Sequence, residues 1–196
     1  MKRHASTLGL LFAAIMMVFA SCSPKKTETD SKEIAEEQNE EKFDSSNIEK
    51  DVEWATEIAD ASLLEVRLGE LAQSKASSPQ VKELGKMMVT DHTKANEELN
   101  ALAGKKNISL PNTLSDKSQK KFDDLSTKSG TDFDKEYSSA MVDGHKEVLS
   151  KFKKESEDGK DADLRAWAEG KLPVLQHHLS MSEQTHDAVK KIAKSK

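Results

Sequence analysis

The sequence is poor in the residues on which disulfides, tight turns and sheets depend. It has one cysteine, four prolines and eight glycines, and aromatic residues make up only 5% of its 196 positions. A single cysteine excludes an internal disulfide. Strict alternation of apolar and polar residues, which is typical of strands, does not occur, and clusters of β-branched residues are few. The composition therefore favours an all-α protein that is stabilised by helix packing.

Long apolar runs are also missing, with one exception near the N-terminus. Lys2 and Arg3 precede an apolar stretch, residues 8–20, which leads through a serine into Cys22. The stretch is short for a membrane span, and its charged start and small-residue end are typical of a cleaved export signal. The ending resembles the bacterial lipoprotein signal, in which the cysteine thiol receives lipid. We expect residues 1–21 to be a lipoprotein signal peptide and Cys22 to be the lipid attachment site, with an uncleaved anchor helix or a free thiol as the alternative.

These features predict a protein of the cell envelope, anchored through lipidated Cys22 and expected at the outer membrane facing the periplasm. The formal charge is -5, and loss of Lys2 and Arg3 with the signal would change it to -7. An acidic surface without a basic stripe or an aromatic platform argues against nucleic-acid binding. The membrane is the one partner that the sequence indicates, and it identifies no protein partner.

Residues 22–50 differ in composition from the rest of the chain. They are polar, rich in glutamate and lysine, and almost without apolar periodicity. Because such a segment buries little apolar surface, we expect a flexible tether that holds a folded domain, residues 51–194, away from the membrane.

Apolar residues recur at helical spacing through the folded domain, and turn signals divide it into segments. We expect four long helices, at residues 52–76, 79–104, 132–158 and 161–194. Between residues 105 and 130, Pro111 excludes a continuous helix, and only Phe122 and Leu125 mark a short one. The predicted fold is an all-α, antiparallel, ferritin-like four-helix bundle with one long crossover that carries a short extra helix.

Local signals support these boundaries. Ser78 followed by Pro79 is typical of an N-cap and first turn. Thr131 with Asp134 three residues later is a variant of the capping box. Pro173 lies inside the last predicted helix, where it removes a backbone hydrogen bond, so we expect a kink there.

Polar residues interrupt each apolar stripe near its centre. Glu65, His92, His145 and His178 each lie within about one residue of the midpoint of a predicted long helix, and the midpoints of matched antiparallel helices share one level. Each also lies within about 60° of the centre of its stripe, whereas His177 points away from it. We expect the four side chains to meet in one buried layer.

Three imidazoles and one carboxylate form a ligand set suited to Zn, Cu or Fe, so the layer is a candidate site for a single metal ion. Met88 and Met141 each stand four residues before a histidine. Their thioethers are candidate additional ligands that would favour Cu(I), although methionine on a helix stripe usually fills the core. Asp91 is a further candidate, either as a ligand or as a hydrogen-bond partner of one.

The same layer is open to a second interpretation, as a closed hydrogen-bond network that fixes helix register, with Glu65 ionised and one histidine protonated. The protein would then be a non-catalytic envelope interaction or stress module. We expect His186 to be a partly buried capping histidine and Asp143 to be solvated. No nucleophile elbow, phosphate-binding glycine loop or Cys-His pairing occurs, so no catalytic residue is assigned. Only hydrolysis or redox chemistry at an open metal position would make the protein an enzyme.

Four motifs in order carry a family resemblance. They are LEVRLGELA at residues 64–72, MVTDH at 88–92, DFDKEY at 132–137 with MVDGH at 141–145, and LPVLQHHL at 172–179. Together they resemble the bacterial ferritin-like proteins described as domain of unknown function 4142, over residues 50–192. The resemblance implies a ferritin-like bundle in exported or outer-membrane proteins and no established activity.

Similarity to the ferritins themselves is weaker. Di-iron members of that group place a glutamate three residues before each of two histidines. Here Val89, Val142 and Leu175 occupy those positions. The missing carboxylates argue against iron storage or a di-iron oxidase and leave at most one mononuclear site.

Overall fold

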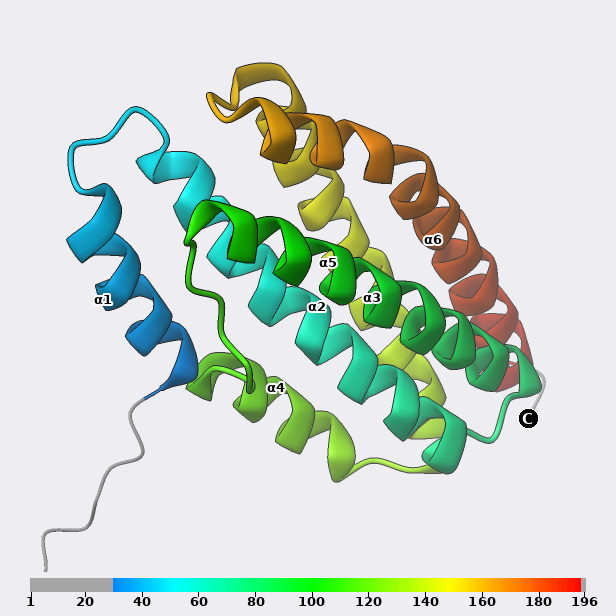
Figure 1. Cartoon of the computed structure of the whole chain (residues 1–196). Helices are drawn as coiled ribbons and strands as arrows, with labels where there is room; N and C mark the ends of the chain where they lie inside the picture. Colours follow the sequence, from blue (N-terminus) through cyan, green and yellow to red (C-terminus); the bar gives the residue numbers. More distant parts are fainter. Residues whose placement is uncertain (1–29, 195–196) are drawn as a thin grey trace, which may run out of the picture.

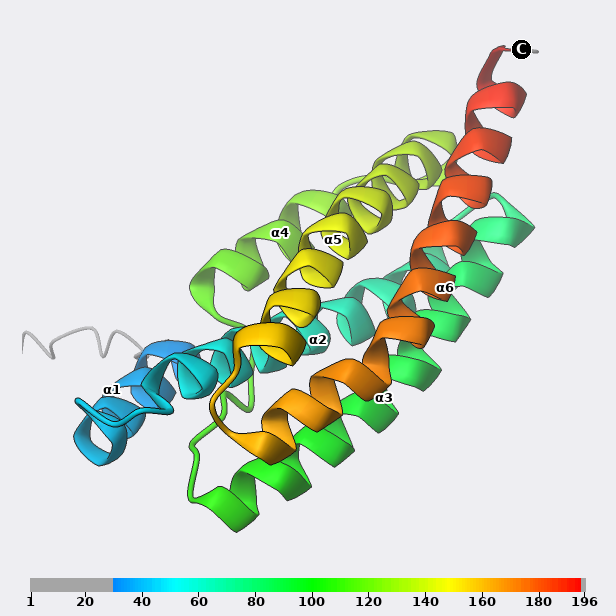
Figure 2. The ribbon, with the colours of Figure 1, turned by 90° about the horizontal axis from the view of Figure 1, so that it is seen from above.

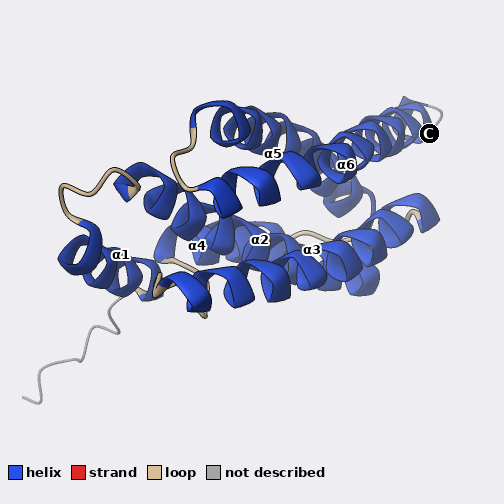
Figure 3. Ribbon diagram, turned by 45° about the horizontal axis from the view of Figure 1, so that its top comes forward, coloured by secondary structure: helices blue, strands red, loops and turns tan. Residues whose placement is uncertain are grey.

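The computed structural model describes residues 30–194, and this part of the chain is all-α. Its helices are α1 (Ser31–Phe43), α2 (Glu49–Lys75), α3 (Pro79–Lys106), α4 (Asp116–Ser126), α5 (Gly130–Asp158) and α6 (Ala162–Lys194). Within the described residues Figure 3 shows only helices and loops, and the bridge between Ala76 and Gly130 is isolated. No helix in this range is long and apolar enough to cross a membrane.

The four long helices form two hairpins, α2 with α3 and α5 with α6, which pack side by side (Figures 1 and 2). The predicted ends of these helices agree with the observed ones to within three residues, and the predicted short helix of the crossover is α4. The α6 helix continues through Pro173, and both views show that it bends along its length. The last predicted helix is thus continuous, as expected, with Pro173 inside it.

The core consists of two apolar clusters, one toward each end of the long helices. One cluster contains Leu99, Leu149 and Leu175. The other contains Met88 and Met141. On α3 and α5 a histidine stands between a methionine of one cluster and a leucine of the other, so the polar layer lies where the two clusters meet.

Two glycines allow α2 and α3 to approach closely. A Cβ atom at Gly69 would lie 2.6 Å from the carbonyl oxygen of Gly85, and one at Gly85 would lie 2.8 Å from that of Gly69. Only residues without a side chain permit this backbone contact. This close contact lies between the midpoints of the two helices and the turn that joins them. It fixes the position of α2 relative to α3.

Buried aspartates cap helices other than their own. On α5, Asp134 accepts hydrogen bonds from the backbone N–H groups of Ser77 at 3.0 Å and Ser78 at 2.9 Å, at the start of α3. The prediction that Asp134 forms a capping box with Thr131 is therefore wrong. Ser78 is the N-cap residue of α3, as predicted, but its own side chain makes no cap hydrogen bond.

Two buried aspartates of α2 make the same kind of contact at the starts of other helices. Asp60 accepts from the backbone N–H of Ser115 at 2.8 Å, before α4, and Asp51 accepts from that of Lys160 at 2.6 Å, before α6. Both carboxylates are buried. Because an uncapped helix start leaves N–H groups without partners, these long-range caps fix where α4 and α6 begin relative to α2.

The expectation of a flexible tether over residues 22–50 is wrong for residues 31–43, which form α1 and pack against α2. Asn39, 5% exposed, explains the difference. Its amide nitrogen donates to Thr56 Oγ1 at 3.1 Å and to the carbonyl oxygen of Ser109 at 2.8 Å, and its Oδ1 accepts from the N–H of Ser109 at 2.7 Å. Polar contacts mainly hold this helix in place. Because such contacts need no apolar stripe, the sequence pattern did not indicate the helix.

Candidate metal centre

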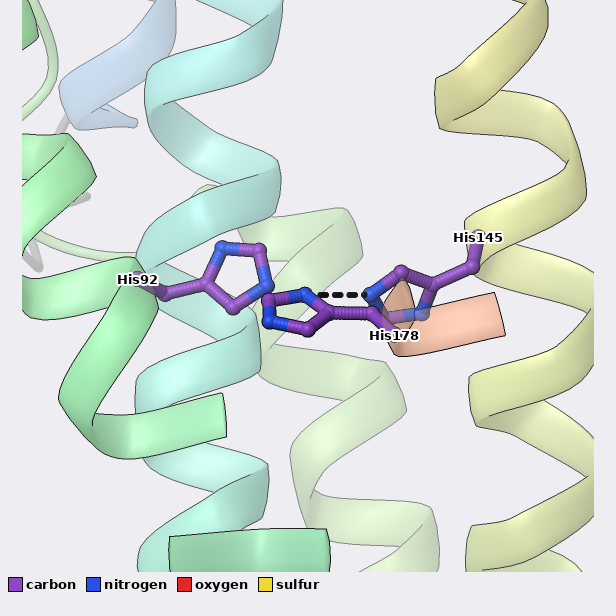
Figure 4. Close-up of side chains that lie close together, drawn as sticks. All are labelled: His92, His145 and His178. Carbon is purple, nitrogen blue, oxygen red and sulfur yellow. Dashed lines mark hydrogen bonds between the residues drawn. The ribbon is translucent and has the colours of Figure 1, made fainter. Parts of the chain in front are cut away.

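Three histidines from three different helices converge at the middle of the bundle. His92 lies on α3, His145 on α5 and His178 on α6, with exposed fractions of 8%, 2% and 1%. One ring nitrogen of each lies within 4.8 Å of the others, and Figure 4 shows the three rings gathered between the helices. The predicted meeting of these three side chains in one buried layer is thus observed.

The rings form a nearly regular triangle. Their centroids are 5.3 Å apart for His92 and His178, 5.3 Å for His145 and His178, and 5.9 Å for His92 and His145. The shortest contact joins His145 Nε2 to His178 Nδ1 at 3.3 Å, the dashed line of Figure 4.

Groups behind the rings decide which nitrogens carry protons. His145 Nδ1 lies 2.9 Å from the carbonyl oxygen of Met141, which can only accept, so this nitrogen is the donor, and in the neutral ring Nε2 carries the lone pair. His178 Nε2 donates to the Asp91 carboxylate at 2.9 Å, which leaves the lone pair of neutral His178 on Nδ1. When both rings are neutral, the 3.3 Å contact brings two lone pairs face to face.

Two facing lone pairs repel unless a cation lies between them. A proton is one solution, but it would make an imidazolium in the core. Burial lowers the pKa of His178, and although Asp91 acts in the opposite direction the net shift is downward. Charging this ring is therefore opposed by its surroundings.

His92 completes the triangle with a nitrogen that has no partner. Its Nδ1 lies 3.2 Å from Ser62 Oγ, and its Nε2 is buried without a hydrogen bond. Burial, followed by the neighbouring His178 and His145, holds the pKa of His92 well below its usual range. A neutral imidazole with an unpartnered buried nitrogen is an available metal ligand.

Glu65, the fourth predicted member, lies outside the group of three nitrogens but lines the same pocket from α2. Its Oε2 is buried without a hydrogen-bond partner. Burial raises the pKa of this carboxyl, and the opposing effects of His145 and Lys121 are smaller. The structure therefore places Glu65 on the pocket wall beside the histidines and not among the converging ligand atoms.

Of the additional candidate ligands, Asp91 contacts a histidine of the centre, whereas the two methionine side chains belong to the apolar core. Asp91 pairs with His178 and not with its sequence neighbour His92. Met88 and Met141 belong to the apolar core and do not line the pocket, so only the backbone carbonyl of Met141 takes part in the centre. Their role as core residues agrees with the usual use of methionine on a helix stripe.

The remaining predicted polar residues are more distant. His177 and Asp143 are exposed, as expected. His186 is half-buried, as predicted, but it pairs with Ser138 Oγ at 2.9 Å inside the bundle instead of capping a helix. Cys22 lies outside the described residues.

Ser62, which contacts His92, and Tyr137, which lies near Glu65, had no predicted role at the centre. Ser62 stands one turn before Glu65 on α2, and that spacing is a signal that could have identified it. Tyr137 is fully buried in the same apolar cluster as Met88 and Met141, and its hydroxyl has no hydrogen-bond partner. Burial and the nearby Glu65 carboxylate raise the pKa of Tyr137 well above its usual range, so this hydroxyl stays protonated.

The spacing of the two facing nitrogens suits a metal ion. Bonds of about 2.0–2.1 Å from a tetrahedral Zn²⁺ to two imidazoles put the nitrogens about 3.3–3.4 Å apart. His145 Nε2 and His178 Nδ1 are 3.3 Å apart. Three buried imidazoles whose ring nitrogens converge within 4.8 Å, each contacted on another nitrogen by an oxygen atom, can serve as the ligands of a three-histidine metal centre.

Comparison with known proteins gives a family and nothing closer. No curated protein and no solved structure matches the chain. A family model described as a domain of unknown function, DUF4142, matches residues 34–185. The match includes α2, α3, α4, α5 and all three converging histidines, and so the chain belongs to the family of domain of unknown function 4142.

Proposed function

We propose that the protein binds one transition-metal ion through His92, His145 and His178. The observation that carries this proposal is the convergence of three buried imidazoles, with one ring nitrogen of each within 4.8 Å of the others. Zn, Cu and Fe are the candidate ions, because imidazole suits all three. Three protein ligands leave a fourth position open on a tetrahedral ion.

The surrounding groups would orient the ligands. Asp91 holds Nε2 of His178, the carbonyl of Met141 holds Nδ1 of His145, and Ser62 contacts Nδ1 of His92. Such partners typically change metal affinity about 10- to 100-fold when they are removed. We assign to Glu65, on the pocket wall, a hydrogen bond to whatever occupies the fourth position.

Metal content and thermal stability test the proposal. Protein prepared without a metal-affinity tag should contain about one ion per chain. A free metal concentration about 100 times Kd should raise Tm by about 5–10 °C, because ligand binding stabilises the folded state. Elemental analysis and thermal unfolding measure the two effects.

Matched variants separate the centre from general histidine binding. His92→Ala and His145→Ala should lose the bound metal and the rise in Tm, whereas His177→Ala, at an exposed position beside the centre, should keep both. Asp91→Asn should weaken binding about 10- to 100-fold. Unchanged metal content in His92→Ala, or no rise in Tm with Zn, Cu or Fe, would contradict the proposal.

One observation favours a second function, that of a non-catalytic interaction or stress module. If His178 is doubly protonated, hydrogen bonds run without a break from Asp91 through His178 and His145 to the carbonyl of Met141. The layer would then only fix helix register. Under this alternative, apolar residues of similar size at the three histidines preserve or raise stability. They also leave the biological phenotype intact.

The location of the protein is part of the proposal. The N-terminal signal and Cys22 support export and lipid anchoring in the cell envelope, with the outer membrane facing the periplasm as the place. The two packed hairpins and the crossover that carries α4 support a ferritin-like connectivity. The open fourth metal position would permit chemistry, but we assign no catalytic residue.

A further inference from the structure

A pocket of about 140 Å³ lies beside the three histidines. Its walls come from α2, α3, α5 and α6, and most of its surface is apolar. Leu99, Phe152 and Trp167 are among the lining residues. Since α3 and α6 pack less closely than the helices within each hairpin, the pocket lies at the looser contact between hairpins.

The volume of the pocket sets the size of the group that it can enclose. A buried apolar cavity of about 150 Å³ is known to accept benzene. The flat rings of Phe152 and Trp167, with centroids 5.6 Å apart and planes inclined by 42°, form one wall. Ring faces of this kind favour contact with another aromatic ring. One aromatic ring therefore matches both the size and the lining.

The inner part of the pocket holds polar atoms without partners. His92 Nε2 and Glu65 Oε2 are both buried and make no hydrogen bond, and both residues line the pocket. Leaving such atoms unpaired is costly. A hydroxyl group can donate to either atom when that atom is unprotonated, and it can also accept from the other when the other carries a proton.

The outer part of the pocket is held in place by an ion pair. Glu98 accepts a hydrogen bond from Trp167 Nε1 at 3.2 Å and pairs with Lys171. The Lys171 ammonium group also lies 5.6 Å from the Trp167 ring centroid. These contacts order the indole ring at the wall, so the pocket is formed before a ligand arrives.

We propose that this pocket binds a small phenol, one aromatic ring with one hydroxyl group, with the ring against Phe152 and Trp167 and the hydroxyl between His92 and Glu65. The inference stands on the pocket and its unpartnered atoms and does not need a bound metal. Because His92 Nε2 is also the nitrogen that the proposed ion would need, phenol and the ion would be alternative occupants of this atom.

Phenol itself is the probe, titrated into metal-free full-length protein in the presence of a chelator. A ligand with so few atoms should bind with Kd of about 1 mM or tighter. Isothermal calorimetry gives the affinity, and the indole N–H resonance of Trp167 reports on the position. Phenol should bind about 10-fold more tightly than toluene, because only phenol supplies a hydrogen bond.

Filling the pocket tests the location without removing a polar group. Ala95→Leu on α3 and Ala61→Leu on α2 both place methyl groups in the pocket and should weaken phenol binding at least about 10-fold. Ala101→Leu, at an exposed position of α3, should have no effect. Glu65→Ala should remove the preference for phenol over toluene while toluene still binds.

Three results would overturn the inference. They are no saturable binding of phenol up to about 10 mM, undiminished binding in folded Ala95→Leu and Ala61→Leu, and equal affinities for phenol and toluene in the unsubstituted protein. Binding that appears only after metal is added would overturn the assignment of the hydroxyl to His92 and Glu65. Because the titration is done without metal, failure of the metal proposal leaves its outcome unchanged.

Discussion

Glu155 of α5 is a buried carboxyl at the opposite end of the bundle from the turn between α2 and α3. It is 6% exposed, and its Oε1 has no hydrogen-bond partner. Burial, followed by the like charges of Asp51 and Asp161, raises the pKa of Glu155 to about 7, against the smaller effects of Arg165 and Lys154. At pH values between the ordinary pKa of glutamate and this raised pKa, the carboxyl therefore takes up a proton when the chain folds.

The pKa of Glu155 predicts a stability that falls as pH rises. Between pH 4.5, the ordinary pKa of the group, and about 7, the folded chain binds more protons at this position than the unfolded chain. Stability contributed by neutral Glu155 is therefore fully present at low pH and is lost as pH rises through about 7. Glu155→Gln should flatten this part of the profile and gain stability relative to the unsubstituted protein at pH above 7.

Urea unfolding at a series of pH values measures the effect. Histidines with lowered pKa values change the profile in the opposite direction, so the informative quantity is the difference between the unsubstituted protein and the variant. Glu157→Gln, at an exposed position of α5, is the matched control. A difference between Glu155→Gln and the unsubstituted protein that does not vary with pH would contradict the prediction.

The contact between Gly69 and Gly85 sets how α2 and α3 lie against each other at the metal centre. Gly69→Ala would bring a methyl group to 2.6 Å from the Gly85 carbonyl oxygen and 2.8 Å from a methyl group of Val89. Since backbone cannot yield to such a contact without moving the helices apart, we expect a loss of about 1–3 kcal/mol in the free energy of unfolding. Metal affinity should fall as well, because Ser62 and Glu65 would shift relative to His92.

Gly104→Ala provides the control for this substitution. It lies near the end of α3, and a Cβ atom there would have nothing within 4 Å. Alanine in a helix is favoured over glycine by about 1 kcal/mol, so this variant should be as stable as the unsubstituted protein or more stable. Chemical denaturation measures both variants. Equal effects of the two substitutions would show that the contact between Gly69 and Gly85 is not the constraint that we describe.

We propose that the whole protein is anchored to the membrane through lipid on Cys22. Cys22→Ser removes the thiol that lipid would modify, and no helix among residues 30–194 could replace it as a membrane span. We expect the unsubstituted protein in the membrane fraction and the variant in the soluble fraction of the envelope, with unchanged thermal stability. Cell fractionation with mass spectrometry of the N-terminus measures this. Equal membrane association of the two forms would argue against lipid anchoring.

The sequence by itself determined the secondary structure of the folded domain. Apolar spacing and turn residues are local properties, and they predicted α2, α3, α5 and α6 with small errors at the ends. The same spacing put His92, His145 and His178 at the midpoints of three helices, and their convergence followed because matched helices share a level. The helix ends and the position of each histidine along its helix were predictable because each depends on one helix at a time.

Only the tertiary structure decided how the helices are rotated and which groups meet across them. Asp91 was predicted as a ligand or as a hydrogen-bond partner of one, and only the structure shows that its partner is His178. Asp134 was expected to cap its own helix but caps α3. Asn39 attaches α1 through hydrogen bonds to residues 17 and 70 positions away, contacts that leave no periodic pattern. A hydrogen bond over such separations depends on the relative placement of two elements within a few tenths of an ångström, which the packing of the core determines and local sequence does not.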